Sequence, residues 1–408
     1  MTTSKGPLDH IMVLDFGQIY NGPYCGLLLG FLGARVIKIE PLEGDIVRRR
    51  HPDGEPYPYL WLNSNKESLA VDLKTADGRK IVQRLAEKAD IVVENFNIGV
   101  MDRCGVGWDD LRKINPRLIY GSSKGFGLDG PNKELPAMDL TIQAISGAMN
   151  ATGFPDGPPI KAGPAISDFM GGVHLCVAIL AALHNREKTG KGQLVEGSMQ
   201  EAMVFAMASA MGAHLEAEKG GKKVPPRTGN MHPGLAMAPY NVYPASDGHV
   251  AIICVSEKHW KDMALVIGRE ELLEEAHLSD TIGRAENMAE VDAAVTGWSQ
   301  QHTKQEIADL LTASNVPFAP VKTVAEVAED PHLIERGMWK DMPHKTHTVV
   351  RLPTSPIRLH GSPVRTIERI APTLGEHTDH ILQDILGMSD AEIEALRSTH
   401  SVGGKKVS

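Results

Sequence analysis

Residues 11–40 read IMVLDFGQIYNGPYCGLLLGFLGARVIKIE, and this stretch sets the fold class. Its two ends, 11–16 and 35–40, are short runs of apolar and β-branched residues, which are typical of buried strands. The segment 22–32 between them is apolar and long enough for a helix. A strand, a helix and a second strand in this order predict two parallel strands joined by a crossover helix.

The same alternation continues to residue 125. Further strands are predicted at 69–73, 90–96 and 117–122, and a further helix at 77–89. Parallel strands of this kind are buried between helices, so we predict an α/β fold with a large Rossmann-like parallel-sheet domain. No GxGxxG motif follows the first strand, and a nicotinamide-dependent oxidoreductase is therefore poorly supported.

The second half of the chain predicts a smaller α+β domain. A strand at 193–197 and an Ala/Met-rich helix at 199–215 lead into a charged stretch, 216–226, that ends in two prolines and indicates a linker. The later predicted elements are a hairpin around Ser246-Asp247-Gly248, helices at 257–267, 289–301 and 304–314, and strands at 349–352 and 357–360. The predicted domains are 1–200 with 321–408 (large), 201–225 (helix and linker) and 226–320 (small).

Composition excludes several classes of protein. The 408-residue chain carries a net charge of −9, which argues against a general nucleic-acid binder. Its four cysteines are widely spaced, so neither a disulfide framework nor a zinc site is indicated. His377 and His380 form a surface pair more readily than a metal site. The longest apolar run, 173–183, is too short to span a bilayer, so we expect a soluble, cytoplasmic protein without a metal.

One acidic residue lies where a loop meets a helix. Residues 152–159 read TGFPDGPP, and residues 166–172 read ISDFMGG at the start of an apolar-periodic helix. A carboxylate there lies in the positive end of the helix dipole, which is expected to keep Asp168 ionised. An ionised carboxylate suits covalent attack on an acyl group. Taken locally, an ordinary helix N-cap is the favoured alternative, because Ser and Asp are preferred at that position.

Eleven short motifs occur in a characteristic order along nearly the whole chain. They are VLDF (13–16), NGPY (21–24), LGAxVIKIE (32–40), NxNKxS (63–68), VDLK (71–74), VVENF (92–96), MDR (101–103), NPR (115–117), SKG (123–125), QAxSG (143–147) and LGEHT (374–378). Together they resemble the class III CoA-transferases of the formyl-CoA transferase type, a family related to carnitine CoA-transferase and α-methylacyl-CoA racemase.

This resemblance implies an enzyme that moves CoA from an acyl-CoA donor to a free carboxylic acid. The family's nucleophilic aspartate falls on Asp168, and the implied intermediates are an aspartyl anhydride and an aspartyl-CoA thioester. CoA thioester is a substrate here, and no permanently bound cofactor is expected. Family members build the large domain from both chain ends and form interlocked homodimers, so a homodimer is expected, with no nucleic acid or membrane partner.

The resemblance also implies roles for individual residues. The reacting centre would include Asp168, Asp139, Gly171 and Gly172. The contacts to CoA would come from Tyr20, Asn21, Val71, Lys74, Asn95, Phe96 and Arg103. On the substrate side, Arg50 would contact the acid, and Gly229 and His232 would belong to a mobile lid. Two departures are Pro41 and Pro136, which stand where formyl-CoA transferases carry basic nucleotide contacts.

Most of these residues have a plain structural alternative. Gly171 and Gly172 could serve helix packing, Val71 and Phe96 could be core residues, and Asp139 could cap a helix at 140–145. Lys74 could be an ordinary surface lysine. The three arginines 48–50 could form a solvated run or hold CoA phosphates, whereas Arg50 alone could pair with the second carboxylate of a dicarboxylic acid.

Three other functions compete with CoA transfer between acids. An α-methylacyl-CoA racemase needs an acid/base group on each face of the α carbon. Racemases carry a catalytic histidine near residue 138, where this chain has methionine, and a thioether does not move protons. A non-catalytic acyl-CoA-binding protein and an intramolecular CoA transferase remain open on the sequence alone.

Overall fold

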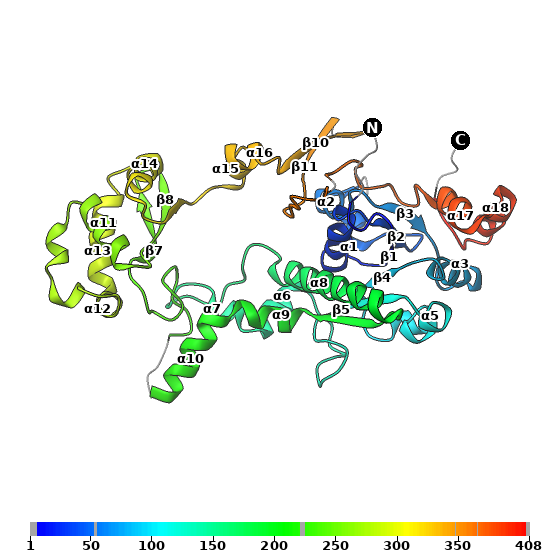
Figure 1. The fold of residues 1–408 in the computed structure, drawn as a ribbon, viewed down its shortest axis with the longest axis horizontal. Helices are drawn as coiled ribbons and strands as arrows, with labels where there is room; N and C mark the ends of the chain where they lie inside the picture. Colours follow the sequence, from blue (N-terminus) through cyan, green and yellow to red (C-terminus); the bar gives the residue numbers. More distant parts are fainter. Residues whose placement is uncertain (1–5, 53–54, 221–224, 347, 365, 405–408) are drawn as a thin grey trace. The chain divides into compact units, whose positions relative to one another are not determined.

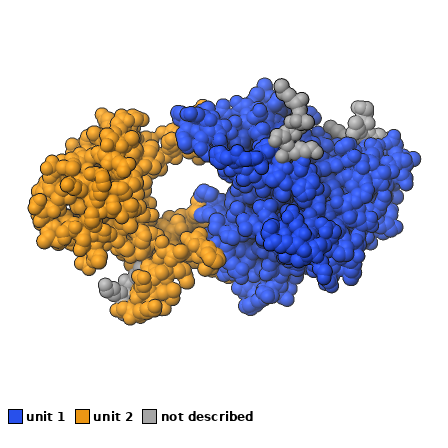
Figure 2. Space-filling model, viewed as in Figure 1, with its two compact units in different colours: residues 1–142, 164–203, 331–408 blue, residues 143–163, 204–330 orange. Residues whose placement is uncertain are grey.

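Residues 6–52, 55–220, 225–346, 348–364 and 366–404 are described by the structure, a computed structural model. The chain divides into two units (Figure 2). Unit 1 comprises Met1–Ile142, Pro164–Met203 and Pro331–Ser408, and unit 2 comprises Gln143–Gly163 and Val204–Asp330. These boundaries differ from the predicted domains, because 143–163 and 321–330 fall in unit 2. Residues 221–224 of the predicted linker lie outside the described residues.

Unit 1 is built on a six-stranded, all-parallel sheet (Figure 1). In spatial order the strands are β3 (Glu67–Ala70), β2 (Arg35–Glu40), β1 (Met12–Asp15), β4 (Ile91–Glu94), β5 (Ile119–Lys124) and β6 (Leu194–Ser198). The strand order reverses direction between β1 and β4, which is the doubly wound arrangement. The predicted α/β class is confirmed.

Helices cover both faces of this sheet because consecutive strand residues point to opposite sides. Val13 packs in a cluster with Leu28 and Ile179, whereas its neighbour Leu14 packs in a second cluster with Leu85 on the other face. The helices of unit 1 are α1 (Asn21–Phe31), η1 (Ile46–Arg50), α2 (Tyr57–Asn63), α3 (Ala76–Ala86), α4 (Val100–Arg103), α5 (Trp108–Ile114), α8 (Ile166–Thr189), α16 (Pro331–Glu335), α17 (Thr378–Leu386) and α18 (Asp390–Ser398). Two helices lead from unit 1 into unit 2, namely α6 (Asp139–Ile145) and α9 (Met199–Ala206).

The helix α8 has 24 residues and is long and apolar enough to cross a membrane by composition. The apolar run expected to be too short is therefore part of a longer helix. Half of its most apolar window is buried inside the protein. It packs against α1, β5 and β6, which makes it a core helix of unit 1.

Unit 2 contains a three-stranded antiparallel sheet in the order β7-β8-β9, as expected for a smaller α+β region. Its elements are α7 (Ala148–Ala151), α10 (Ala208–Gly220), β7 (Tyr240–Ala245), β8 (Gly248–Ile253), α11 (Glu257–Val266), η2 (Glu270–Leu273), η3 (Ala276–Leu278), α12 (Thr281–Glu286), α13 (Met288–Ser299), α14 (Lys304–Ser314), β9 (Phe318–Pro320) and α15 (Val324–Ala328). The predicted hairpin turn lies between β7 and β8. The helix α14 starts at a capping box formed by Thr303 and Glu306.

Two local predictions were wrong, and one strand was missed. The helix predicted at 199–215 is interrupted at Met207 and continues as α10 to Gly220. Residues 357–360 form no strand. The strand predicted at 349–352 is present as β11 (Thr348–Pro353), but its antiparallel partner β10 (Trp339–His344) was missed, because that segment lacks an apolar alternation.

Candidate active site

A cavity of about 270 Å³ opens in unit 1 at the carboxyl ends of the strands. Its walls come from the loops after β1 and β4, the end of β5 and the start of α9, so it straddles the point where the strand order reverses. Ligands bind at this place in open α/β sheets. The lining residues are Gln18, Ile19, Asn21, Asn95, Phe96, Asn97, Ile98, Val100, Ser123, Lys124, Gly125, Lys133, Leu135, Ala137, Met138, Asp168 and Met199.

Asp168 reaches this cavity from the first turn of α8 and is 9% exposed. Burial raises the pKa of its carboxyl to about 7, the negative charge of Asp139 adds to the rise, and Arg50 opposes it. Asp168 is therefore only partly ionised near neutral pH, in contrast to the expectation that the helix dipole keeps it ionised. Removal from water outweighs the dipole, which falls off within the first turn.

Asp168 is not the cap of its own helix. The N-cap residue of α8 is Ala165, which has no capping side chain. Instead Asp139 accepts hydrogen bonds from the backbone N–H of Ser167 at 2.9 Å and from its hydroxyl at 2.6 Å. The structural alternative for Asp139, a helix cap, thus applies to the start of α8, whereas the alternative had placed it before residues 140–145. This contact fixes the turn that carries Asp168 and leaves the Asp168 carboxylate without a hydrogen bond among the described residues.

Gly171 and Gly172 lie where α8 crosses α1. A Cβ atom on Gly171 would lie 2.3 Å from Nδ2 of Asn21, and one on Gly172 would lie 2.7 Å from the Asn21 carbonyl oxygen. Helix packing therefore accounts for both glycines. The space at Gly171 is occupied by the Asn21 amide, whose Nδ2 donates to the carbonyl of Asp168 at 3.2 Å.

The loop 16–20 between β1 and α1 has a strained backbone. Ile19 has a φ of +68°, which is unusual for a β-branched residue. Asn95 holds the loop from β4, because its Oδ1 accepts from the Gln18 N–H at 2.8 Å and its Nδ2 donates to the Gln18 carbonyl at 2.9 Å. Strain of this kind persists only where the surroundings fix the conformation.

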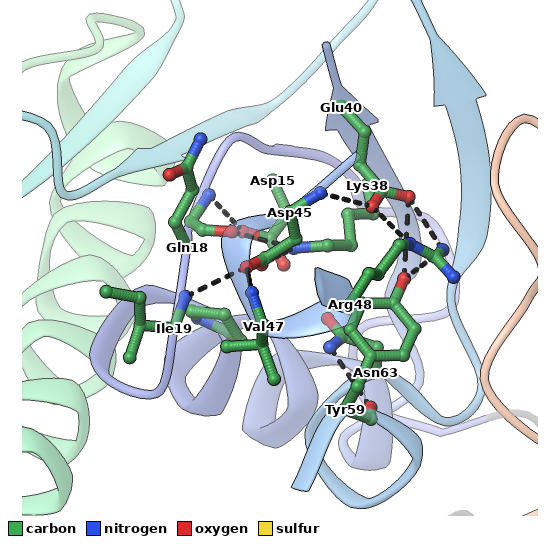
Figure 3. Close-up of polar contacts among 12 residues, drawn as sticks. Asp15, Gln18, Ile19, Lys38, Glu40, Asp45, Val47, Arg48, Tyr59 and Asn63 are labelled. Carbon is green, nitrogen blue, oxygen red and sulfur yellow. Dashed lines mark hydrogen bonds and ion pairs between the residues drawn. The ribbon is translucent and has the colours of Figure 1, made fainter. Parts of the chain in front are cut away.

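A buried ionic network makes hydrogen bonds to the backbone of this loop (Figure 3). The Lys38 ammonium donates to the Gly17 carbonyl at 2.7 Å and to Asp45 at 3.0 Å, and both charged side chains are 1% exposed. The Asp45 carboxylate also accepts from the Ile19 N–H at 3.5 Å. Beside it, Lys66 binds Asp15 at 2.7 Å. The loop is thus held by ion pairs whose side chains are fully buried.

The three consecutive arginines have different surroundings. Arg48 is buried, binds Glu40 at 2.8 Å and lies over the Tyr59 ring at 3.9 Å, so a fully solvated run was a wrong alternative. Arg50 is exposed and its guanidinium lies 5.9 Å from the centre of the Tyr20 ring. Because Arg50 also lowers the pKa of Asp168, its charge acts at the cavity.

The remaining residues predicted to bind CoA differ in access. Phe96 lines the cavity and also packs against a core cluster. Val71 is 1% exposed and packs in that cluster, which was the structural alternative. Lys74 precedes α3, Arg103 ends α4, and both are exposed outside the cavity wall.

Gly229 and His232 belong to unit 2. Gly229 has a φ of +63°, and a Cβ there would lie 2.9 Å from the Phe154 ring. The His232 ring packs edge-on against Tyr240 and accepts from the Gly234 N–H at 3.0 Å. Their assignment to a lid stays a prediction.

Several cavity residues were missed as functional residues. Lys124 lies in the SKG motif, but its ammonium is engaged by Glu94 at 2.7 Å and by the Phe96 carbonyl at 2.6 Å. Lys133 is exposed, lines the cavity and precedes Pro136, so it offers a cation near one of the two positions where the expected basic contact is replaced by proline. Ser123 lines the cavity with a buried hydroxyl. Only the shared motif could have pointed to Ser123 and Lys124.

The raised pKa of Asp168 leads to a pH prediction. If the ionised carboxylate is the reacting form, kcat/KM should rise with pH and level off above an apparent pKa of about 7. Replacing Asp139 by Asn removes a negative charge and keeps the acceptor for Ser167, so the inflection should move to lower pH. A rate that is constant between about pH 5 and 9 would contradict this assignment.

Comparisons with known proteins identify the family and agree with the fold. The profile of CoA-transferase family III matches residues 8–378. The chain is 35% identical to formyl-CoA:oxalate CoA-transferase of Streptomyces avermitilis, with 96% of this chain and 98% of that protein covered. It is 36% identical to succinyl-CoA:mesaconate CoA-transferase of Haloarcula hispanica, with 93% and 96% covered.

A solved structure is similar over the same length. The crystal structure of a CaiB/BaiF family protein from Brucella suis has a TM-score of 0.81 and 34% sequence identity. The alignment covers 93% of this chain and all of that chain, 100%. With nearly the whole sequence matched by the family profile, the chain belongs to CoA-transferase family III and is an enzyme of that class.

Proposed function

We propose that the protein moves CoA from an acyl-CoA donor to a free carboxylic acid, with Asp168 as the covalent nucleophile. The observation that carries this proposal is a single buried carboxyl, with its pKa raised to about 7, in a cavity at the switch point of the sheet. A pKa near the working pH balances ionisation against reactivity. The proposal includes a cytoplasmic location.

The reaction would proceed in four balanced steps. An Asp168 oxygen attacks the thioester carbonyl, the C–S bond breaks, and an aspartyl anhydride forms with release of CoA thiolate. The thiolate attacks the aspartyl carbon and expels the donor acid, which leaves an aspartyl-CoA thioester. The acceptor carboxylate attacks this thioester and releases thiolate again. Attack by that thiolate on the acceptor carbonyl yields the new acyl-CoA and restores the carboxylate.

Positions around the cavity support a binding path for CoA. Asn95 and Phe96 would lie along the pantetheine arm, and the exposed Lys133 would meet a phosphate that Pro136 leaves without a cation. Lys74 and Arg103 are exposed and do not line the cavity, so they would contact only a part of the CoA nucleotide that extends beyond it. The assignment of Gly229 and His232 to a mobile lid stays part of the proposal.

A racemase is the weaker alternative. Met138, near the position where racemases carry their catalytic histidine, lines the cavity and provides no proton. The other ionisable groups of the described cavity wall are Lys124, whose ammonium is engaged by Glu94, and the exposed Lys133. This arrangement does not supply the acid/base pair on two faces that α-proton exchange needs.

The choice of acid can be tested at Arg50. Its exposed guanidinium beside Tyr20 acts on Asp168 and could pair with the second carboxylate of a dicarboxylic acid. We expect Arg50→Gln to raise the KM for dicarboxylate acceptors by at least about tenfold and to spare monocarboxylates, because a charged hydrogen bond is worth about 1.5–3 kcal/mol. The measurement is a panel of acyl-CoA donors against mono- and dicarboxylates, read as new CoA thioesters by mass spectrometry.

Two controls accompany that panel. Arg49→Gln changes the neighbouring exposed arginine and should leave the acid preference unchanged. Equal losses for both acid classes, together with weaker CoA binding, would assign Arg50 to CoA phosphates. Absence of thioester exchange with every pair, despite CoA binding, would instead favour a non-catalytic acyl-CoA-binding protein.

We also propose an interlocked homodimer. The helix α10 has no buried residue among its 13 positions, and Phe205 before it is 79% exposed. Apolar surface of this kind usually marks an interface. We expect sedimentation to show a dimer at micromolar concentration and Phe205→Glu to weaken it, with Lys219→Glu as a control on α10. A stable, active wild-type monomer would contradict the proposal.

A further inference from the structure

Two residues that line the Asp168 cavity each carry a buried polar atom without a hydrogen-bond partner among the described residues. The atoms are Oδ1 of Asn21 and Oγ of Ser123, and each of these residues is 2% exposed. A buried polar atom without a partner is costly, so native proteins rarely leave two such atoms in one cavity wall without a ligand or another function for them.

The two side chains are held in place by their surroundings. The Asn21 amide is oriented because its Nδ2 donates to the Asp168 carbonyl, which leaves Oδ1 as the unsatisfied end. Ser123 lies on β5, paired with Gly197 of β6, so its backbone position is fixed by the sheet.

The chemistry of these two atoms limits what they can bind. An amide oxygen only accepts, so the ligand must donate to Asn21, whereas a hydroxyl can donate or accept. An ionised carboxylate has no proton to donate. The nearby cation Lys124 is engaged by Glu94 and is not available to balance further negative charge.

We propose that Asn21 and Ser123 recognise a neutral group of the acyl-CoA that both donates and accepts a hydrogen bond. This inference rests on the proposed CoA transfer at Asp168. Two parts of the substrate have this chemistry: a hydroxyl group on the acyl chain, and an amide of the pantetheine arm. The pair thus adds affinity for the acyl-CoA beside the nucleophile without taking part in the bond changes.

The test measures binding in the Asp168→Ala background, where no adduct should form. Dissociation constants for 3-hydroxybutyryl-CoA, butyryl-CoA and free CoA are determined by calorimetry with and without Ser123→Ala. If the acyl hydroxyl is recognised, Ser123→Ala weakens only 3-hydroxybutyryl-CoA, by about tenfold. If a pantetheine amide is recognised, all three ligands weaken by a similar factor.

Ser122→Ala is the matched control on the same strand. Ser122 is equally buried, but its hydroxyl donates to Glu94, so this variant should lower the Tm and leave the three affinities unchanged. Ser123→Ala should not lower the Tm, because its hydroxyl has no protein partner to lose. Changes below twofold for every ligand, or a fall in Tm equal to that of Ser122→Ala, would overturn the inference.

The same proteins separate this inference from the proposed function. If the wild-type enzyme exchanges thioesters but Ser123→Ala leaves the affinities unchanged, the recognition role is excluded and the proposed CoA-transferase function stands. No exchange with any donor and acid removes the transferase itself, whatever Ser123→Ala does to binding.

Discussion

Asp168→Ala is expected to abolish CoA transfer, with kcat falling by at least about a thousandfold, while CoA binding stays nearly unchanged. The carboxylate would form every covalent intermediate, so its removal leaves no path of comparable rate. The walls of the cavity contributed by Asn95 and Phe96 would remain. Exchange is measured by mass spectrometry and binding by calorimetry. In the wild type with donor present, hydroxylamine should trap an adduct on Asp168. Normal turnover by Asp168→Ala would contradict the mechanism.

Asp168→Asn separates lost chemistry from lost folding. The folded pKa of Asp168, about 7, lies above its ordinary value of 3.8, so ionisation is disfavoured in the folded state. At low pH the group is protonated in both the folded and the unfolded state and costs no stability. As pH rises from about 4 to 7, the free energy of unfolding falls, because the unfolded state loses this proton more readily than the folded state. The Asn variant avoids this loss and should be more stable at pH 8, by up to about 4 kcal/mol. An inactive variant with increased stability therefore excludes misfolding.

The strands and their order along the chain could be predicted well from local sequence. β2 was predicted at 35–40, its observed bounds, because RVIKIE is a β-branched run followed by a turn. The prediction failed where local pattern and tertiary pairing differ. β10 reads WKDMPH, which contains Pro and two charged residues, and it is a strand only because it pairs with β11.

The site shows a similar division between local and tertiary information. The resemblance placed Asp168, Asn21 and Asn95, and the structure brings all three to one cavity. Local reasoning misjudged the ionisation of Asp168, because burial depends on segments distant in sequence. It also assigned the Asp139 cap to the wrong helix, since the contact with Ser167 spans 28 residues.

Buried charges could not be predicted at all from periodicity. Lys38 lies in a strand and Lys66 in a loop, and neither position distinguishes a surface lysine from a buried one. In the structure both are 1% exposed. They are tolerated because each ammonium meets a carboxylate: Lys38 binds Asp45 and Lys66 binds Asp15. A buried charge without a partner would be far more costly.

Lys66→Met should give the largest loss of stability that we predict, about 3–5 kcal/mol of unfolding free energy. The Lys66 ammonium makes three hydrogen bonds, to Asp15 at 2.7 Å, to the Pro23 carbonyl at 2.9 Å and to Asn63 at 3.0 Å. Methionine has a similar length but leaves the Asp15 carboxylate buried at 0% exposure without its cation. Urea unfolding measures the change.

Two further variants decide whether the unpaired charge causes that loss. In Lys66→Met/Asp15→Asn the buried negative charge is also removed, so part of the lost stability should return, whereas two independent effects would add. Lys80→Met changes a lysine whose side chain is 72% exposed and should alter stability by less than about 0.5 kcal/mol.

Because Asp15 also accepts from the Gly17 N–H at 2.8 Å, loss of its cation should loosen the loop that presents Asn21 to Asp168. Activity should therefore fall together with stability in Lys66→Met and recover in the double variant. If Lys66→Met costs less than about 1 kcal/mol, the Asp15–Lys66 pair does not support the site.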